Sequence, residues 1–230
     1  MLIDCAGNPM EANEMCKLVT RKIAISCRCN FSLHGMSCIA HDRKSLSCLL
    51  KTNDFLTLHS TFNSDFEFDD VFVHVQSGVS GELRLIQKFI TSHSPPRVFV
   101  LVDNAHAPTL KLLRAMGMIF IVSLRDSLSN IGRLLQGYSI ASYMSPDLHA
   151  VIKAIQPAPV WAKEWGAFDG VQYFTPTETE IILDLLHGIS PWQVARKRFV
   201  SVKTVSTHKL NALRKMELQR LNEFFTTPWR

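Results

Sequence analysis

The hydrophobic pattern of the last quarter of the chain predicts a run of short amphipathic helices separated by polar turns. After Thr175, apolar residues recur at helical spacing, and Glu178 follows Thr175 by three residues, as in a reciprocal capping box. Gly188 is expected to end this helix, and Ser190, which is followed by proline, is expected to begin the next. Ser201 is placed to cap a third helix, so the pattern predicts an all-helical domain.

The second and third of these helices differ in what they are expected to bury. The second helix is expected to bury Val194, Ala195 and Phe199. The apolar positions of the third helix are Val202, Val205, Leu210, Leu213 and Met216. Its other face is crowded with polar and basic residues, namely Lys203, Thr204, Ser206, Thr207, Lys209 and Arg214. A fourth helix over residues 219–226, with an apolar side, is a candidate element for pairing two chains.

The order helix, glycine turn, helix, serine-led turn and polar helix is a helix-turn-helix arrangement. It resembles the LuxR-type DNA-binding domain, through Phe174-Thr175-Pro176-Thr177-Glu178, Gly188-Ile189-Ser190, Val194-Ala195, Ser201-Val202-Lys203-Thr204-Val205-Ser206-Thr207-His208 and Lys215-Met216. The resemblance implies a four-helix domain that binds double-stranded DNA as one half of a dimer, with the third helix in the major groove.

The candidate DNA-binding residues follow from the chemistry of this third helix. Lysine side chains attract phosphates, and short hydroxyl side chains reach base edges in the major groove. The candidates are Ser201, Lys203, Thr204, Ser206, Thr207, His208 and Lys209. Ser201 could bind a phosphate because a helix N-terminus presents free N–H groups. His208 could instead pack inside the domain. The alternative for Lys203 and Lys209 is that they form an ordinary solvent-exposed surface that does not contact DNA.

The distribution of charge agrees with a DNA-binding domain at this end of the chain. Residues 174–230 contain nine basic and five acidic residues, so they carry +4 of the total net charge of +5. The preceding 173 residues are nearly neutral. The basic character therefore lies where the predicted recognition helix lies.

The region before this domain alternates short apolar strands with helices. The expected strands lie at residues 22–27, 55–58, 70–75, 97–102 and 118–122. The expected helices lie at residues 32–40, 81–90, 110–116 and 128–136. Such alternation predicts an α/β domain with a parallel sheet covered by helices on both faces. The order is similar to the receiver domain of response regulators. We expect this receiver-like domain at 1–140, a linker at 141–173 that begins with a short helix through Ile155, and the helix-turn-helix domain at 174–230.

The resemblance to receiver domains implies a phosphorylation site, but its chemical groups are replaced. Such a site needs an aspartate after the third strand, acids after the first strand to hold Mg²⁺, a hydroxyl residue after the fourth and a lysine after the fifth. Here Val73-His74-Val75-Gln76 ends the third strand, and Arg28 follows the first. Asp103 stands in the hydroxyl position, and Ser123-Leu124 stands near the lysine position. We therefore expect no phosphoacceptor and interpret His74 as an ordinary strand-end residue.

All six cysteines lie in the first fifty residues, at positions 5, 16, 27, 29, 38 and 48, and their spacing matches no zinc pattern. We expect reduced thiols, no metal site, no cofactor and no enzymatic activity.

The sequence contains no apolar run long enough to span a membrane. Acidic residues near the start of the chain argue against a signal peptide there. The expectation is a cytoplasmic protein that is associated with the nucleoid when bound to DNA.

Three functional hypotheses remain. The preferred one is a transcription regulator with a degenerate receiver-like domain, similar to Rcs/Bgl-type auxiliary regulators, that acts without phosphorylation as a homodimer or as a heterodimer with another LuxR-type response regulator. The second is a ligand-sensing LuxR-type regulator, although no tryptophan precedes Trp161 to build an aromatic lactone pocket. The third is a redox- or metal-responsive regulator that uses the cysteines.

Overall fold

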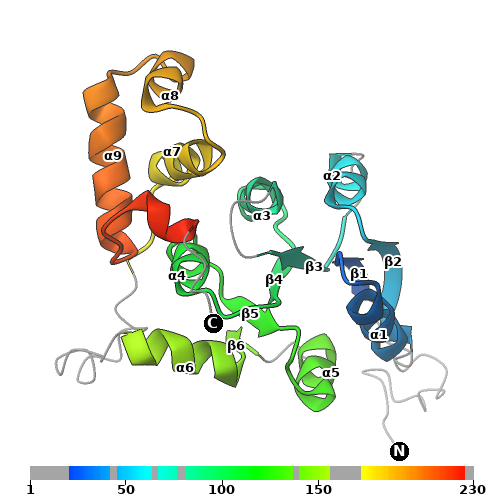
Figure 1. Ribbon diagram of the computed structural model, residues 1–230. Coiled ribbons are helices and arrows are strands. Elements are labelled where there is room, and N and C mark those ends of the chain that lie inside the picture. Colours follow the sequence, from blue (N-terminus) through cyan, green and yellow to red (C-terminus); the bar gives the residue numbers. More distant parts are fainter. Residues whose placement is uncertain are drawn as a thin grey trace, which may run out of the picture.

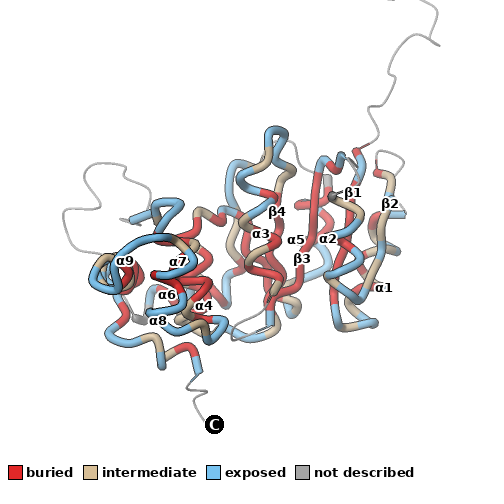
Figure 2. The backbone as a smooth tube through the Cα atoms, turned by 90° about the horizontal axis from the view of Figure 1, so that it is seen from above, coloured by how far each residue is buried: buried red, intermediate tan, exposed pale blue. Residues whose placement is uncertain are grey.

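The computed structural model describes residues 21–41, 46–63, 67–76, 81–136, 140–155 and 172–225. Its first part is built on a six-stranded parallel sheet with the strand order β2-β1-β3-β4-β5-β6. The strands are β1 (Arg21–Ser26), β2 (Leu46–Thr52), β3 (Asp70–Val75), β4 (Arg97–Val102), β5 (Phe120–Ser123) and β6 (Tyr143–Met144). The central strands are apolar almost throughout because both of their faces are covered, and Figure 2 colours them as buried.

Helices lie on both faces of this sheet (Figure 1). They are α1 (Asn30–His41), α2 (Phe55–Asn63), α3 (Glu82–Ile90), α4 (Ala107–Ala115), α5 (Leu128–Gln136) and α6 (Pro146–Ile155). One apolar cluster joins α1 and α5 to the sheet, and a second joins α2, α3, α4 and α6 to its other face. The predicted α/β fold with a parallel sheet and helices on both faces is therefore confirmed.

The prediction of a strand at residues 55–58 is wrong, because these residues form the first turn of α2. Asp54 begins this helix, since its carboxylate accepts hydrogen bonds from the backbone N–H groups of Leu56 and Thr57 at 3.1 and 3.2 Å. The second strand of the sheet is instead β2, at its edge, where several side chains are exposed. A run as short as Phe-Leu-Thr-Leu has too few residues for its hydrophobic pattern to distinguish a strand from a turn of helix.

The α/β part continues into the segment that the sequence assigned to a linker. β6 pairs with β5, and α6 contacts α4, so residues 143–155 belong to the α/β body. The short helix expected through Ile155 is confirmed as α6. The aromatic residues of the expected linker, Trp161, Trp165 and Phe168, lie outside the described residues, as do Cys5 and Cys16.

The carboxy-terminal part contains α7 (Pro176–Leu186), α8 (Pro191–Lys197), α9 (Val202–Lys215) and a short 3₁₀ helix, η2 (Leu221–Phe224). Thr175 and Ser190 form reciprocal capping boxes with Glu178 and Gln193, as expected of Thr175 from its sequence. Gly188 has a φ of +80°, the left-handed backbone that its position after α7 requires. The fourth helix is shorter than predicted, since the described residues after α9 form only a 3₁₀ turn.

Three of the residues predicted to be buried here are exposed. Phe199 is 96% exposed because it occupies the turn between α8 and α9, with a φ of 55°. Val202 lies in the first turn of α9, and Leu210 stands five residues after Val205, which turns it about 140° away from the buried side of the helix. The predictions for these three residues are therefore wrong, whereas Val205, Leu213 and Met216 are buried as predicted.

The two parts of the chain share one apolar cluster. Leu110 and Leu113 of α4 belong to the same cluster as Ile182 of α7 and Phe224 of η2. The backbone N–H of Phe174 also donates a hydrogen bond of 2.8 Å to a carbonyl group at the end of α4. The helical domain is thus docked on α4 and the adjacent end of α3 (Figure 1).

Candidate DNA-binding site

Side-chain caps fix the start of α9 and thereby orient its polar face. The hydroxyl oxygen of Ser201 accepts a hydrogen bond of 3.0 Å from the backbone N–H of Thr204 and lies 2.8 Å from the hydroxyl of the same residue. This arrangement satisfies one of the free N–H groups at the helix start. Ser201 itself is exposed.

The structure divides the predicted DNA-binding residues into two groups. Ser201, Lys203 and Thr207 are exposed, and Lys203 and Thr207 are neighbours one turn apart on the outward face of α9. Thr204, Ser206, His208 and Lys209 are only partly exposed. The hydroxyl of Thr207 donates to the carbonyl of Lys203 at 3.0 Å, which holds this side chain close to the helix.

Lys209 lies on a different side of α9 from Lys203. It follows the buried Val205 by four residues and precedes the buried Ala212 by three, so helix geometry turns it towards the inner side. Arg214, in contrast, is exposed and shares the outward side with Lys203 and Thr207. The outward surface of α9 thus contains two cations, Lys203 and Arg214, and the hydroxyl of Thr207.

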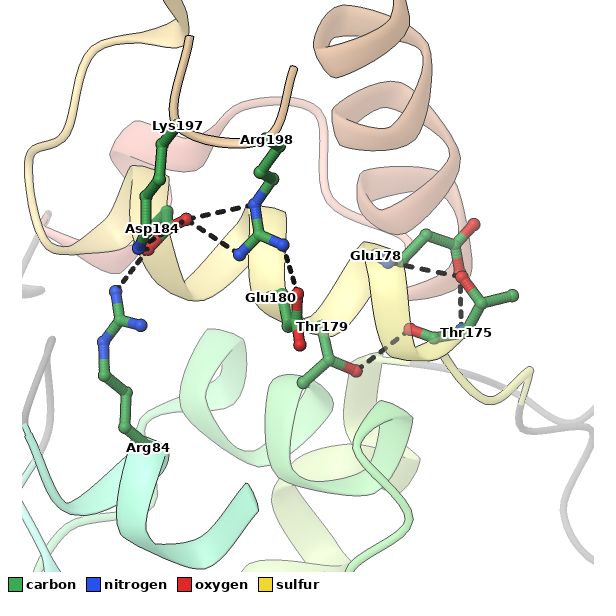
Figure 3. A network of polar contacts seen from close by, with 8 residues as sticks. All are labelled: Arg84, Thr175, Glu178, Thr179, Glu180, Asp184, Lys197 and Arg198. Carbon is green, nitrogen blue, oxygen red and sulfur yellow. Dashed lines mark hydrogen bonds and ion pairs between the residues drawn. The ribbon is translucent and has the colours of Figure 1, made fainter. Parts of the chain in front are cut away.

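A network of charges around one buried carboxylate joins α7 to the end of α8 and to α3, and its central residue was missed by the sequence analysis. Asp184 of α7 has no exposed surface, yet its carboxylate receives three cations (Figure 3). Arg84 of α3 lies 2.5 Å away, Lys197 of α8 lies 3.1 Å away, and Arg198 lies 2.9 Å away. Arg198 also pairs with Glu180. Asp184 therefore connects α7 both to the end of α8 and to the α/β domain.

Burial alone would raise the pKa of Asp184, but the hydrogen bonds from Arg84, Arg198 and Lys197 hold it below its ordinary value. A second buried carboxylate, that of Glu178, receives Lys215 at 2.6 Å and the backbone N–H of Thr175 at 2.8 Å. Its pKa is likewise lowered, because these bonds outweigh its burial. Both carboxylates stay charged at neutral pH, so they hold α7, α8 and α9 in one arrangement.

The carboxyl edge of the sheet, where a receiver domain would hold its phosphorylation site, carries a different set of groups. Arg28, which follows β1, donates to Gln76 after β3 at 3.1 Å and to Glu82 at 2.7 Å. Glu82 is almost fully buried at the start of α3. Asp103 follows β4, as the sequence predicted. Within the described residues, no group of three or more histidine, cysteine, aspartate or glutamate side chains is arranged to hold a metal ion.

His74 is buried in β3, and neither ring nitrogen has a hydrogen-bond partner. Burial lowers its pKa, although the carboxylates of Asp103 and Glu82 act in the opposite direction. The ring is therefore neutral at pH 7 and is enclosed by the sheet.

The described cysteines are free thiols in different surroundings. Cys27 is buried and its pKa is raised by that burial, whereas Cys38 and Cys48 are exposed.

Comparison with known families assigns the carboxy-terminal region. The family model described as "Bacterial regulatory proteins, luxR family" matches residues 172–226. This segment is therefore a LuxR-family helix-turn-helix domain, and it contains α7, α8 and α9. No curated protein matches the chain. In the part of the chain that the structure describes, no helix has the length and apolar character needed to cross a membrane.

Solved structures of the same architecture cover most of the chain. RcsB from Salmonella enterica serovar Typhimurium, bound to promoter P1flhDC in the presence of the phosphomimetic BeF3−, matches with a TM-score of 0.54 and 14% identity, covering 89% of this chain and 96% of that one. A structure of two RcsB dimers bound to two parallel DNAs matches with a TM-score of 0.51, 14% identity and the same coverage. At this identity the likeness shows a shared fold. Residues 172–226 thus match the LuxR family of bacterial regulatory proteins, and the chain as a whole shares the fold of the RcsB response regulator.

Proposed function

We propose that this regulator binds DNA as a dimer through the outward face of α9, and that its activity does not depend on phosphorylation of the receiver-like domain. The dimer is formed with a second copy or with another LuxR-type response regulator. The protein acts in the cytoplasm, on the nucleoid when bound to DNA, and regulates transcription without catalysing a reaction. The proposed division of the chain is a receiver-like domain at 1–140, a linker at 141–173 and the helix-turn-helix domain at 174–230. The first part of the proposed linker, which contains β6 and α6, packs on the receiver-like domain.

The observation that carries the proposal of phosphorylation independence is the Arg28 guanidinium at the carboxyl edge of the sheet. Phosphoryl transfer requires carboxylates that hold Mg²⁺ beside the acceptor. Here a fixed cation occupies the edge and is paired with the buried Glu82 at 2.7 Å. A guanidinium cannot lose its charge in a protein, so it opposes the binding of a divalent cation next to it. Asp103 is a single carboxylate and cannot replace the missing set.

The proposed DNA-binding residues remain Ser201, Lys203, Thr204, Ser206, Thr207, His208 and Lys209. The exposure of Lys203 and Thr207 supports their direct contact with DNA. Lys209 is partly exposed and lies on the inner side of α9, so its proposed contact rests on the sequence resemblance alone. Structures of RcsB with DNA show that a protein of this architecture binds DNA, and one of them contains dimers. These observations support the proposal for the present chain.

Phosphorylation independence is tested with the purified full-length chain. The chain is incubated with acetyl phosphate and Mg²⁺, or with beryllofluoride and Mg²⁺, and its mass and its affinity for a DNA site are measured before and after. We expect no covalent phosphoryl group and no change in affinity. Stoichiometric phosphorylation accompanied by a change in affinity would contradict the proposal. A receiver-containing regulator that accepts phosphate from the same donor serves as the positive control.

The nature of the dimer is tested by selecting genomic DNA fragments with the purified chain alone, without a phosphodonor. Enrichment of a two-fold symmetric site would identify a homodimer that recognises DNA unaided. Binding that is weak, sensitive to salt and indifferent to sequence would identify a regulator that needs a second protein for recognition. Absence of any binding at low salt would contradict the assignment of α9 as a DNA-binding helix.

A further inference from the structure

A cavity of about 250 Å³ lies between α1 and α5, on the face of the sheet opposite the helical domain. Its floor is formed by Phe72 of β3, Leu101 of β4 and Val122 of β5, each at most 2% exposed. Its mouth is bordered by Phe31, which is 91% exposed, and Leu128, which is 71% exposed. Large apolar side chains at the rim and buried ones at the floor make a continuous apolar path from the surface to the sheet.

A glycine in the wall keeps this cavity open. Gly35 lies in the middle of α1, where glycine is unfavourable compared with alanine. Glycine in a helix is often required because another segment approaches closely, but a Cβ atom placed on Gly35 would meet nothing within 4 Å. Close packing therefore does not require a glycine at this position. The space that the missing side chain leaves belongs to the cavity.

The size and lining of the cavity define the class of molecule that fits. An apolar cavity of roughly 150 Å³ stays free of water and binds benzene, so about 250 Å³ accommodates a larger, bicyclic aromatic compound. A protein partner would fill such a space with no more than one or two side chains. The enclosed floor and walls favour a small molecule that is surrounded on several sides.

One polar group at the wall restricts the charge of the ligand. The carboxylate of Asp126 accepts hydrogen bonds from Tyr143 at 2.6 Å and Ser145 at 2.5 Å on one oxygen, and from Asn130 and the backbone N–H of Ser127, both at 2.8 Å, on the other. Burial opposes ionisation, but these hydrogen bonds lower the pKa of Asp126, so the group is an anion at neutral pH. A ligand with its own carboxylate would be repelled by this charge, whereas a neutral molecule would not.

We propose that the cavity between α1 and α5 binds a small, neutral and largely apolar molecule, such as a bicyclic aromatic compound, and that the charge of Asp126 excludes anionic compounds. The site goes beyond DNA binding and does not depend on it. Through Tyr143 and Ser145, Asp126 connects the cavity to β6 and to the start of α6, which contacts α4. Ligand binding would thus act on the side of the α/β domain that carries the helical domain.

The test uses 1-aminonaphthalene as a probe and 1-naphthoate as the matched anionic compound, each titrated into the full-length chain by calorimetry. We expect saturable binding of one 1-aminonaphthalene per chain. Binding of 1-naphthoate should be about tenfold weaker or more, because its carboxylate is repelled by the charge of Asp126. Absence of saturable binding of 1-aminonaphthalene overturns the proposal. Equal binding of the two compounds overturns the role of Asp126.

A pair of variants locates the binding site. Gly35→Leu adds a side chain in the wall of the cavity and is expected to weaken binding of 1-aminonaphthalene about tenfold or more. His34→Leu adds an apolar residue to the same helix, at an exposed position outside the cavity, and is expected to leave binding unchanged. Equal effects of the two variants would overturn the proposal. Circular dichroism confirms that both variants fold.

A measurement on the unaltered chain keeps the test independent of the variants. Methyl groups of Leu101 and Val122 are followed by NMR during the titration, and both are expected to shift in proportion to the saturation seen by calorimetry. Saturation without these shifts would place the probe elsewhere and overturn the proposal. If the probe instead dissociates a dimer, measured by sedimentation, the cavity is an interface between copies rather than a ligand site, and the proposal is likewise overturned.

Discussion

Asp184→Asn removes the negative charge that joins α7 to α8 and to the α/β domain, while it preserves the size and shape of the side chain. In the structure, the buried carboxylate faces Arg84, Lys197 and Arg198 at 2.5, 3.1 and 2.9 Å. The variant retains one amide oxygen as an acceptor, but it leaves three cations around a neutral group. We therefore expect a large loss of stability without a change in fold.

The size of the loss depends on how easily the three cations reach water. Breaking a fully buried ion pair costs about 3–5 kcal/mol, whereas an exposed pair contributes at most about 1 kcal/mol. The side chains of Arg84, Lys197 and Arg198 are 37%, 53% and 20% exposed, and Arg198 keeps Glu180 as a partner. The expected loss lies between these limits, at about 2 kcal/mol in the free energy of unfolding.

The assay is urea unfolding of the wild type and the variant, followed by circular dichroism from pH 8 down to pH 3.5. The folded-state pKa of Asp184 lies below its ordinary value, so its contribution is complete above the ordinary aspartate pKa and is lost as the pH falls through the lowered folded-state value. The difference between the two proteins should be constant at neutral pH and should shrink below about pH 4.

The control is Glu67→Gln, which removes one negative charge at an exposed position. This variant is expected to change the free energy of unfolding by less than about 0.5 kcal/mol. If Asp184→Asn were no more destabilising than Glu67→Gln, the buried charges would not support the helical domain. A difference that did not shrink at low pH would show that lost packing, and not lost charge, causes the effect.

Three further variants test the remaining contacts. Arg84→Ala removes the cation that the α/β domain contributes, and it should cost about 0.5–1 kcal/mol in urea unfolding; an effect that adds fully to that of Asp184→Asn would contradict the direct pairing. Ser201→Ala removes the cap of α9 and should cost about 1 kcal/mol, measured as a lower melting temperature, with an unchanged melting temperature as the contrary result. Lys203→Ala should weaken DNA binding and lower the salt slope by about 0.9 if Lys203 contacts a phosphate, measured by fluorescence anisotropy at several salt concentrations. Unchanged affinity at low salt would remove Lys203 from the DNA-binding surface.

Features that depend on neighbouring residues could be predicted from the sequence. The capping box of Thr175 and Glu178 is visible because its two residues lie three positions apart, and the left-handed backbone of Gly188 follows from its place after a helix. The error at residues 55–58 also had a local signal. Asp54 is a favourable helix cap directly before this run, and it outweighs the apparent alternation of the run.

Features that depend on distant residues could not be predicted in this way. Asp184 and Arg84 are 100 positions apart, and Arg28 and Glu82 are 54 positions apart. An aspartate within an apolar helix gives no indication of which cation neutralises it, because that depends on how the helical domain docks on α3. The side on which Lys209 lies was predictable from the helix period alone, but the crowded polar residues around it suggested a single face.

Helix α3 connects two of the charged sites described above. Glu82 in its first turn is fixed by Arg28 at the carboxyl edge of the sheet, and Arg84, two residues later, reaches Asp184 in the helical domain. In a phosphorylated receiver domain, the charge at this edge would change with the phosphoryl group. Here both ends of the connection are ion pairs formed within the chain, and a guanidinium keeps its charge at any physiological pH. The charge that positions α3 is therefore constant, which fits the proposed regulation by partner or ligand and not by phosphoryl transfer.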